Sequence, residues 1–256
     1  MVTVGTSGFV YKDWKGVFYP EKIKAGELLS YYKDYFRTVE INTTYYGIPK
    51  PSTFGRMIEA TPEDFEFMVK ANKATTHEMN DEEVAETFKD SIAPLKDAGR
   101  LSGILAQFPW RFRNVEKNRS YLSELAERYG DEKLFTEFRH NSWNRDEVFD
   151  FLSRLGIGFV FVDEPQIGKM MPPVARATSD TAYIRFHGRN AKTWWGKSGD
   201  RYNYNYSSEE LDKWIEKIDV LEKTVWKIYA FFNNCHKGYA VRNAMMFMDL
   251  VKKKRK

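Results

Sequence analysis

Eight short apolar segments recur along this chain, about one every 30 residues, and nearly all of them end in charged or amide side chains. Most of the intervals between them are long enough for a helix. Alternating strands and helices predict parallel strands joined by crossovers, and eight such units in about 250 residues match a single-domain α/β fold, the (β/α)8 TIM barrel. The expected strands are Thr3–Gly5, Thr38–Tyr46, Phe65–Ala71, Leu101–Phe108, Lys133–Arg139, Gly158–Asp163, Thr181–His187 and Val225–Asn233.

Five of the intervals show helical periodicity or helix boundary signals. The expected helices are Glu27–Phe36, Glu82–Lys96, Glu116–Tyr129, Asp146–Leu155 and Ser208–Glu222. The interval between the sixth and seventh strands contains Pro165, Pro172 and Pro173, and proline interrupts helices. We therefore expect an irregular sixth crossover.

Composition points to one folded domain. A chain of 256 residues with 42% hydrophobic content can bury a single large core, and we expect residues 1–251 to form the barrel. No apolar stretch approaches the roughly 20 residues that span a bilayer, and the first residues lack the features of a signal peptide. We expect a cytoplasmic protein with no membrane partner. The single cysteine, Cys235, excludes an internal disulfide and a zinc site built from clustered cysteines.

The net charge of +4 at pH 7 comes from the C-terminus. All five residues 252–256 are basic, which leaves 35 Lys and Arg against 36 Asp and Glu in the rest of the chain. We expect residues 252–256 to form a disordered basic tail. A solvated terminus is the simpler interpretation of this tail, and contact with RNA or DNA is the alternative.

Polar residues near the strand ends follow the period of a strand. Residues two apart share a face, so the polar set can point inward while apolar neighbours face the helices. Active sites of such barrels lie at the carboxyl ends of the strands, where these side chains would converge on one pocket. The residues assigned to the inner face are Glu40, Asn42, Lys70, Asn72, Gln107, Glu137, Arg139, Asp163, Arg185 and His187, to which Asn233 is added from the end of the eighth strand.

The charges in this set nearly cancel, which allows two interpretations. One is a buried ion-pair network that only holds the barrel together. However, buried ion pairs are poor stabilisers because desolvation offsets the attraction, and expensive buried polar groups tend to mark functional sites. We therefore favour a functional site. The carboxylates are Glu40, Glu137 and Asp163, and the cations are Lys70, Arg139 and Arg185.

Three of the four histidines lie at or just after strand ends, where an imidazole can transfer protons or bind a metal near pH 7. These are His77, His140 and His187. His187 is the strongest candidate because it shares a strand face with Arg185. A divalent metal ion is a further alternative, although no motif with metal-binding spacing supports it. Its expected ligands would be Glu40, Glu137, Asp163 and His187, and the cofactor is left open.

Residues 188–207, GRNAKTWWGKSGDRYNYNYS, are too many for a simple turn after the seventh strand. Aromatic residues such as Trp194 and Tyr202 interleave here with basic residues, a combination that suits a base, a sugar ring or a phosphate-bearing ligand. The alternative is that the alternating Tyr202, Tyr204 and Tyr206 only pack this loop onto the barrel.

Several segments together resemble one family. They are GTSGFVYKDWKGVFYP, EINTTYYGIP, FMVKANKATTH, QFPWRF, EFRHNSW, IRFHGRN, YNYNYS and FFNN. Their sequence and order are similar to the domain of unknown function 72 family, also called YecE-like, from Gly5 to about residue 244. The resemblance implies a TIM barrel and a set of polar positions, but no reaction, because the function of the family is not established. The implied positions are Glu40, Asn42, Lys70, His77, Gln107, Glu137, Arg139, His140, Asp163, Arg185 and His187.

Three functions follow as hypotheses. The favoured one is an enzyme that uses acid/base chemistry on a small, polar, anionic substrate, phosphorylated or polyhydroxylated, in the barrel mouth. Its base would be Glu40, Glu137 or Asp163, its acid His187, and its substrate-binding residues Asn42, Lys70, His77, Gln107, Arg139, His140, Arg185, Trp194, Tyr202 and Asn233. The second is a nucleic-acid-binding protein or metal-dependent phosphodiesterase that uses the aromatic loop and the basic tail. The third is a non-catalytic interaction module. Reaction type, substrate and oligomeric state are left open.

Overall fold

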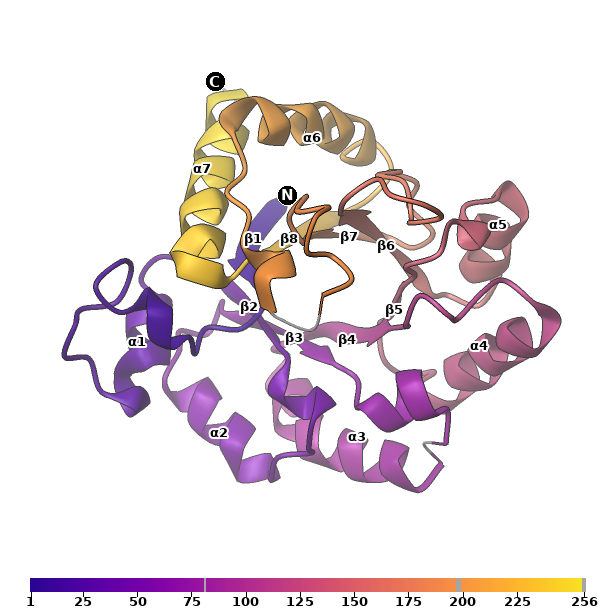
Figure 1. Ribbon diagram of the computed structural model, residues 1–256. Coiled ribbons are helices and arrows are strands. Elements are labelled where there is room, and N and C mark those ends of the chain that lie inside the picture. Colours follow the sequence, from indigo (N-terminus) through magenta and orange to yellow (C-terminus); the bar gives the residue numbers. More distant parts are fainter. Residues whose placement is uncertain (81, 197–198, 255–256) are drawn as a thin grey trace.

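The computed structural model describes residues 1–80, 82–196 and 199–254. Eight parallel strands surround a central axis, and helices lie outside them (Figure 1). The strands are β1 Val2–Thr6, β2 Thr38–Ile41, β3 Glu66–Lys70, β4 Leu101–Gln107, β5 Leu134–Glu137, β6 Gly158–Asp163, β7 Thr181–Phe186 and β8 Lys227–Phe232. The helices are α1 Leu28–Tyr32, α2 Pro51–Glu59, α3 Glu82–Asp97, α4 Glu116–Arg128, α5 Asp146–Arg154, α6 Ser208–Leu221 and α7 Tyr239–Lys254.

The barrel closes between β1 and β2. Hydrogen-bonded neighbours run from β1 through β8 back to β2, and a parallel bridge joins Ser7 to Glu40 across the remaining gap. The backbone N–H of Gly8 donates to the Glu40 carbonyl oxygen at 2.8 Å. The two strands approach closely because Gly5 has no side chain: a Cβ there would lie 2.4 Å from the carbonyl oxygen of Thr38. The predicted (β/α)8 barrel is confirmed.

Several elements differ in extent from the sequence-based expectation. The strand expected over Thr38–Tyr46 ends at Ile41, because Thr43–Tyr45 form a 3-10 turn that redirects the chain over the barrel mouth. Helix α2, which begins with a proline in its first turn, and helix α7 were not expected. The sixth crossover, residues 164–180, contains no helix along its fully described length, as its prolines predicted.

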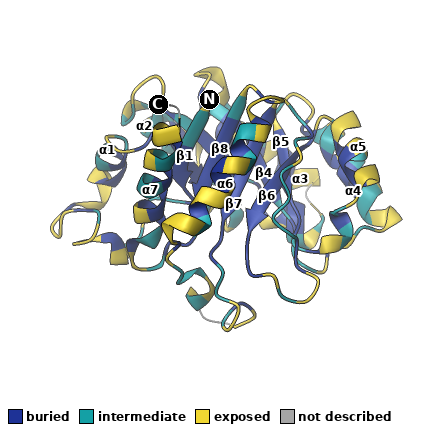
Figure 2. Cartoon of the chain, turned by 90° about the horizontal axis from the view of Figure 1, so that it is seen from above, coloured by how far each residue is buried: buried dark blue, intermediate teal, exposed yellow. Residues whose placement is uncertain are grey.

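The basic C-terminus is part of a helix rather than a disordered tail as far as it is described. Lys252–Lys254 form the last turn of α7, and Lys254 pairs with Asp219 of α6. The expectation of disorder from residue 252 is therefore wrong for these three residues, and residues 255–256 lie outside the described part of the chain. Helix α7 follows β8 and runs back along the barrel, so its last turn lies at the same end of the barrel as the N-terminus (Figure 2), away from the loop residues Trp194 and Tyr202 at the mouth. Among the described residues, no helix combines the length and apolarity needed to cross a membrane.

Strand register determines which side chains enter the barrel. Arg185 of β7 aligns with Phe231 of β8 and Val162 of β6, and Glu137 of β5 aligns with Gln107 of β4. Residues two apart share a face, so one alternating set from every strand points inward. The other set is apolar and packs against the helices; it includes Val39, Val69, Ile104, Phe161, Phe186 and Phe232, all fully buried.

Candidate functional site

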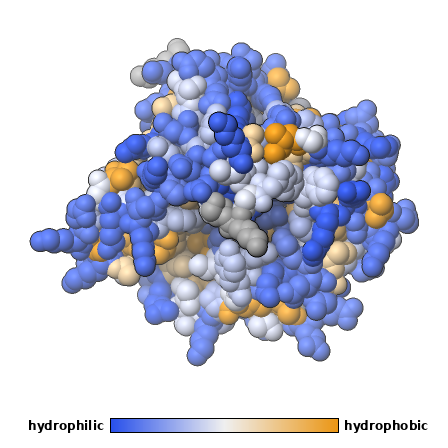
Figure 3. Space-filling view, viewed as in Figure 1, coloured by the Kyte–Doolittle hydropathy of each residue, from blue (hydrophilic) through white to orange (hydrophobic). Residues whose placement is uncertain are grey.

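The carboxyl ends of the strands lie on the face of the molecule that Figure 3 shows, where hydrophilic residues predominate. Two adjoining cavities of about 440 and 280 Å³ lie there. The larger extends towards Gly8, Tyr11 and Asn233, and the smaller towards His77 and Trp110. Both are lined by Tyr45, Tyr46, Lys70, Gln107, Arg139 and Tyr202.

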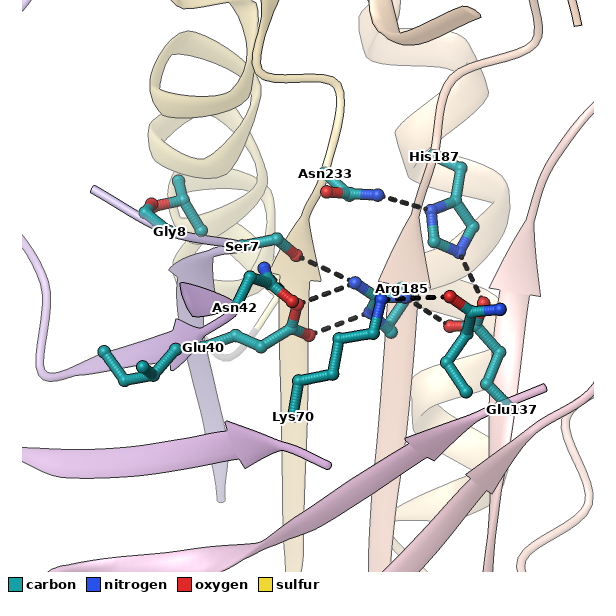
Figure 4. A network of polar contacts seen from close by, with 12 residues as sticks. Ser7, Gly8, Glu40, Asn42, Lys70, Glu137, Arg185, His187 and Asn233 are labelled. Atoms are coloured by element: carbon teal, nitrogen blue, oxygen red, sulfur yellow. Dashed lines mark hydrogen bonds and ion pairs between the residues drawn. The ribbon is translucent and has the colours of Figure 1, made fainter. Parts of the chain in front are cut away.

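Arg185 is the centre of the polar network below these cavities (Figure 4). Its Nε and Nη2 donate to the two carboxylate oxygens of Glu40 at 2.8 and 2.6 Å, and its Nη1 donates to Glu137 at 2.5 Å. Tyr183 and Asn42 also donate to Glu40. Burial opposes the ionisation of Glu40, but the Arg185 guanidinium outweighs it and holds the pKa of this carboxyl below its usual value. Glu40 therefore stays ionised and fully engaged by its neighbours.

Arg139 extends the network across the barrel. Its Nε lies 2.7 Å from Glu137 and its Nη1 lies 2.5 Å from Glu164, the residue after β6. Burial again opposes ionisation of Glu137, but Arg139 and Arg185 together hold its pKa well below the usual value. Glu164 behaves differently, because burial outweighs Arg139 and raises the pKa of its carboxyl to about 8. Glu164 is therefore mostly protonated at pH 7.

His187 is fully buried beneath the cavities and lines neither of them. The side-chain amide nitrogen of Asn233 lies 2.9 Å from its Nδ1, and since an amide N–H can only donate, Nδ1 accepts and the proton sits on Nε2. Nε2 lies 3.3 Å from Glu137. Burial and then the charge of Arg139 lower the pKa of His187 to about 3. The imidazole is neutral and lies beside Glu137 outside both cavities, so the acid role expected for it has no support in this geometry.

Lys70 differs from the two arginines because no carboxylate in the described chain forms an ion pair with it. Its Nζ donates to Gln107 Oε1 at 3.0 Å and lies 4.6 Å from the centre of the Tyr45 ring. The amide nitrogen of Gln107 is held by the carbonyl oxygen of Phe108, which fixes the oxygen towards Lys70. Burial, followed by the charge of Arg185, lowers the pKa of Lys70 to about 8. The remaining N–H groups of Lys70 are available to a ligand in either cavity.

Aromatic side chains form the wall of the smaller cavity. Trp194 is buried with its ring 5.7 Å from the Arg139 guanidinium carbon, and Tyr202 lines both cavities. His77 packs edge-on against Tyr45, and burial, with the charge of Lys70, lowers its pKa to about 4. In contrast, Tyr206 is buried in the core. The packing interpretation of the aromatic loop thus holds for Tyr206, whereas Trp194 and Tyr202 line a cavity and their expected role in ligand binding stays a prediction.

Two predicted site residues lie elsewhere. Asp163 points away from the barrel axis, where Trp214 of α6, Tyr206 and Arg189 all donate to its carboxylate. Its assignment to the inner face was wrong, because Val162 is aligned with the inward Arg185 and its neighbour must face outward. His140 is buried outside both cavities, and its Nδ1 accepts from the backbone N–H of Ser142.

The inner face of the barrel also holds two residues that the sequence did not suggest, Glu164 and Tyr183. Glu164 is two residues beyond Val162 and therefore shares its inward face, as its contact with Arg139 shows. Tyr183 donates to Glu40 from the inner face of β7. The expected sixth strand ended at Asp163, one residue before Glu164. An alignment of Val162 with Arg185 of the seventh strand would have placed Glu164 on the inner face.

The expected metal ligands do not come together. Asp163 faces α6, and the Arg185 guanidinium lies between Glu40 and Glu137. Among the described residues, no group of three or more His, Cys, Asp or Glu side chains is arranged to hold a metal ion. The chemical character of this site is instead that of cations, amides and aromatic rings around a cavity.

Comparisons with known proteins give one consistent result. Residues 3–256 match the family model described as protein of unknown function DUF72. The chain is 30% identical to the UPF0759 protein YunF of Bacillus subtilis, over 98% of this chain and 95% of that protein. A crystal structure of a DUF72 family protein from Thermotoga maritima is 45% identical, with a TM-score of 0.92 over 98% of this chain and 99% of that one. A second, from Enterococcus faecalis, is 27% identical with a TM-score of 0.88 over 98% and 96%.

Proposed function

The chain belongs to the family described as protein of unknown function DUF72, and from that premise we propose that it is an enzyme that binds a small anionic substrate in the barrel mouth and transfers protons to or from it. The observation that carries this proposal is Lys70, a cation that borders both cavities and that no described carboxylate neutralises. The family description assigns no function, and the support for this proposal comes from the geometry of the site.

The buried and partly buried charges around the cavities leave one positive charge at pH 7, and the exposed Arg201 adds a second at the edge of the smaller cavity. Arg139, Arg185 and Lys70 are cations, whereas Glu40 and Glu137 are the two carboxylates whose pKa values are held low. Glu164, with its pKa raised to about 8, is mostly neutral at this pH. A buried excess charge is unfavourable unless a counter-ion is present. An anionic ligand beside Lys70 would supply that counter-ion.

The walls of the cavities favour a ligand with a flat or ring-shaped part. Tyr45, Tyr202 and Trp110 line the smaller cavity, and aromatic faces bind sugar and base rings by stacking. Asn42 contributes a buried amide oxygen, and no hydrogen-bond partner within the described chain satisfies it. A hydroxyl group of the ligand would satisfy this acceptor. These features fit a phosphorylated or carboxylated ring compound.

Proton transfer in this site is best assigned to Lys70. A group transfers protons most efficiently when its pKa is near the working pH, and that of Lys70 is about 8. Glu40 and Glu137 are held ionised by arginines and do not line the cavities, and His187 is neutral beneath them. We therefore assign the acid/base role to Lys70 in place of the four residues expected from the sequence, which are Glu40, Glu137, Asp163 and His187.

The test is a thermal-shift screen of the purified protein against sugar phosphates, nucleotides, carboxylated sugars and short oligonucleotides. A ligand at 100 times its Kd should stabilise the protein by about 2.7 kcal/mol, or roughly 5–10 °C for a domain of this size. Lys70→Met should abolish the shift. The matched control is Lys73→Met, because Lys73 lies three residues away on the surface and pairs with Glu78 at 2.8 Å.

The outcomes separate the remaining functions. A shift from a small anion that survives in Lys70→Met would overturn the proposal. A shift only with oligonucleotides would favour nucleic-acid binding. The basic last turn of α7 lies at the same end of the barrel as the N-terminus (Figure 2), so one short oligonucleotide could not contact this turn and the aromatic loop at the mouth together. No shift with any compound would favour the non-catalytic module.

A further inference from the structure

Lys70 occupies an environment that resembles that of a nucleophilic amine more than that of a lysine with a purely structural role. A structural lysine would be expected to pair with a carboxylate, yet Glu40 and Glu137 are both engaged by Arg185. Lys70 instead contacts a neutral amide oxygen and an aromatic ring. A lysine that is desolvated and surrounded by other cations keeps a substantial fraction of its amine neutral and nucleophilic near physiological pH.

The access to Lys70 is also suited to covalent chemistry. The side chain extends from the end of β3 to the boundary of the two cavities, so a substrate in either of them can reach its Nζ. The Gln107 amide holds the amine in place through a single hydrogen bond of 3.0 Å. Arg139 lines both cavities as well, at a position where it can bind an anionic group of the same molecule.

We propose that Lys70 is a covalent catalyst whose ε-amine forms an imine with an aldehyde or ketone group of the anionic substrate. This inference rests on the proposed function, since it assigns a reaction intermediate to the same cavity. It also narrows the substrate class to carbonyl compounds that carry a phosphate or carboxylate.

The reaction balances without an oxidant or a reductant. The neutral amine attacks the carbonyl carbon, a C–N bond forms, and the carbonyl oxygen takes a proton to give a carbinolamine. The nitrogen then loses a proton while the C–O bond breaks, and the hydroxyl leaves with a proton as water. Amine, carbonyl and one proton thus yield the protonated imine and one water. The protonated imine has the same +1 charge as the ammonium it replaces, so the neighbouring carboxylates Glu40 and Glu137 would stabilise it equally well.

Tyr45 lines both cavities and can donate a hydrogen bond to the substrate. Burial raises the pKa of its phenol, so the hydroxyl stays protonated near pH 7 and donates a hydrogen bond, while the protons of these steps are exchanged with water. Once formed, a protonated imine withdraws electrons from the adjacent carbon. This activates a neighbouring C–H or C–C bond for cleavage, and the reaction class is therefore that of an isomerase, lyase or aldolase-type enzyme.

The experiment is reductive trapping with a defined probe. The full-length protein is incubated with pyridoxal 5′-phosphate, an aldehyde with a ring and a phosphate, and the imine is reduced with sodium borohydride. Peptide mapping by mass spectrometry should place one secondary amine on Lys70 at low probe concentration. Its rate of formation should rise with pH and level off above about pH 8, because the reactive amine is the neutral form. Inorganic phosphate should protect Lys70 from trapping, and Lys73→Met should leave trapping unchanged.

A second variant separates this inference from the proposed function. Lys70→Arg keeps the positive charge but cannot form an imine, so it should retain the stabilisation by phosphate-bearing compounds and lose the trapping. Trapping confined to surface lysines in wild-type protein that still binds phosphate compounds would overturn the imine and leave the proposed function standing. If the wild-type protein neither binds phosphate compounds nor forms the trapped amine, the imine and the proposed function are both overturned.

Discussion

Replacing Arg185 with methionine should destabilise the barrel strongly and in a pH-dependent manner. Arg185 is 1% exposed and makes three hydrogen bonds of 2.5–2.8 Å to the carboxylates of Glu40 and Glu137. Glu137 would keep Arg139, but Glu40 would be left as a buried carboxylate with only neutral donors. Removing one partner of a buried pair costs about 3–5 kcal/mol. At roughly 2–4 °C per kcal/mol, Arg185→Met should lower Tm by about 6–20 °C.

The pH dependence identifies the cause. In the wild type, Arg185 holds the folded-state pKa of Glu40 below its value of 4.5 in the unfolded chain, so Glu40 contributes stability above pH 4.5 that is lost only as pH falls through the lower value. In Arg185→Met, burial is no longer outweighed, and the folded-state pKa rises above 4.5. The variant then loses stability as pH increases through that raised value. The deficit relative to wild type should therefore be larger at pH 8 than at pH 5.

The assay is urea unfolding at both pH values, with two companion variants. Arg176→Met is the matched control, because Arg176 is 45% exposed and its pairs with Asp146 and Asp150 lie on the surface, where ion pairs contribute about 0–1 kcal/mol. Glu40→Gln combined with Arg185→Met removes the stranded charge and should be more stable at pH 8 than Arg185→Met alone. The reasoning is refuted if Arg185→Met is no worse than Arg176→Met, or if its deficit is the same at both pH values.

Three further predictions concern residues around the barrel. Asp163→Asn should lower the free energy of unfolding in urea by about 1–3 kcal/mol, because three donors lose a charged acceptor. Stabilisation by small anions should stay unchanged in this variant, and its loss would show that Asp163 belongs to the binding site. Gly5→Ala should cost about 1–3 kcal/mol by forcing a Cβ against Thr38, whereas Gly26→Ala, with nothing within 4 Å, should stay within about 0.5 kcal/mol; equal Tm values would contradict the closure argument. Burial raises the folded-state pKa of Glu164 from 4.5 to about 8, so the stability that this residue contributes is present below pH 4.5 and is lost as pH rises through 8. Glu164→Gln should remove this loss of stability, and parallel curves of unfolding free energy for variant and wild type between pH 5 and 9 would disprove the prediction.

The sequence predicted the barrel because its signal is repeated eight times. Each strand pairs an apolar outer set with a polar end, and an error in one strand, such as the overextension of Thr38–Tyr46, leaves the other seven intact. Helix α2 was missed because Pro51–Glu59 follows a turn that sequence analysis had absorbed into the preceding strand. The basic C-terminus was misjudged because composition alone does not show that Lys254 can pair with Asp219 on a neighbouring helix.

The site was predictable where strand phase could be read within one segment and unpredictable where it depends on register between segments. Glu137 and Arg139 share a face by spacing alone, and they do contact each other. Asp163 and Glu164 are adjacent, and only the alignment of β6 with β7 decides which of them points inward. Which cation lacks a carboxylate partner depends on distances between five strands, and no local pattern contains that information.

The partners of the three inward cations account for why the surplus charge is on Lys70 and not on an arginine. Arg185 and Arg139 each present several donors in a plane, and these reach the carboxylate oxygens of Glu40, Glu137 and Glu164. An ammonium in either position would leave carboxylate oxygens without donors. Lys70 contacts a single amide oxygen, and it borders both cavities. The arginines hold the carboxylates, and their positive charges in turn help to keep the lysine amine available, so the structural network and the proposed chemistry depend on the same residues.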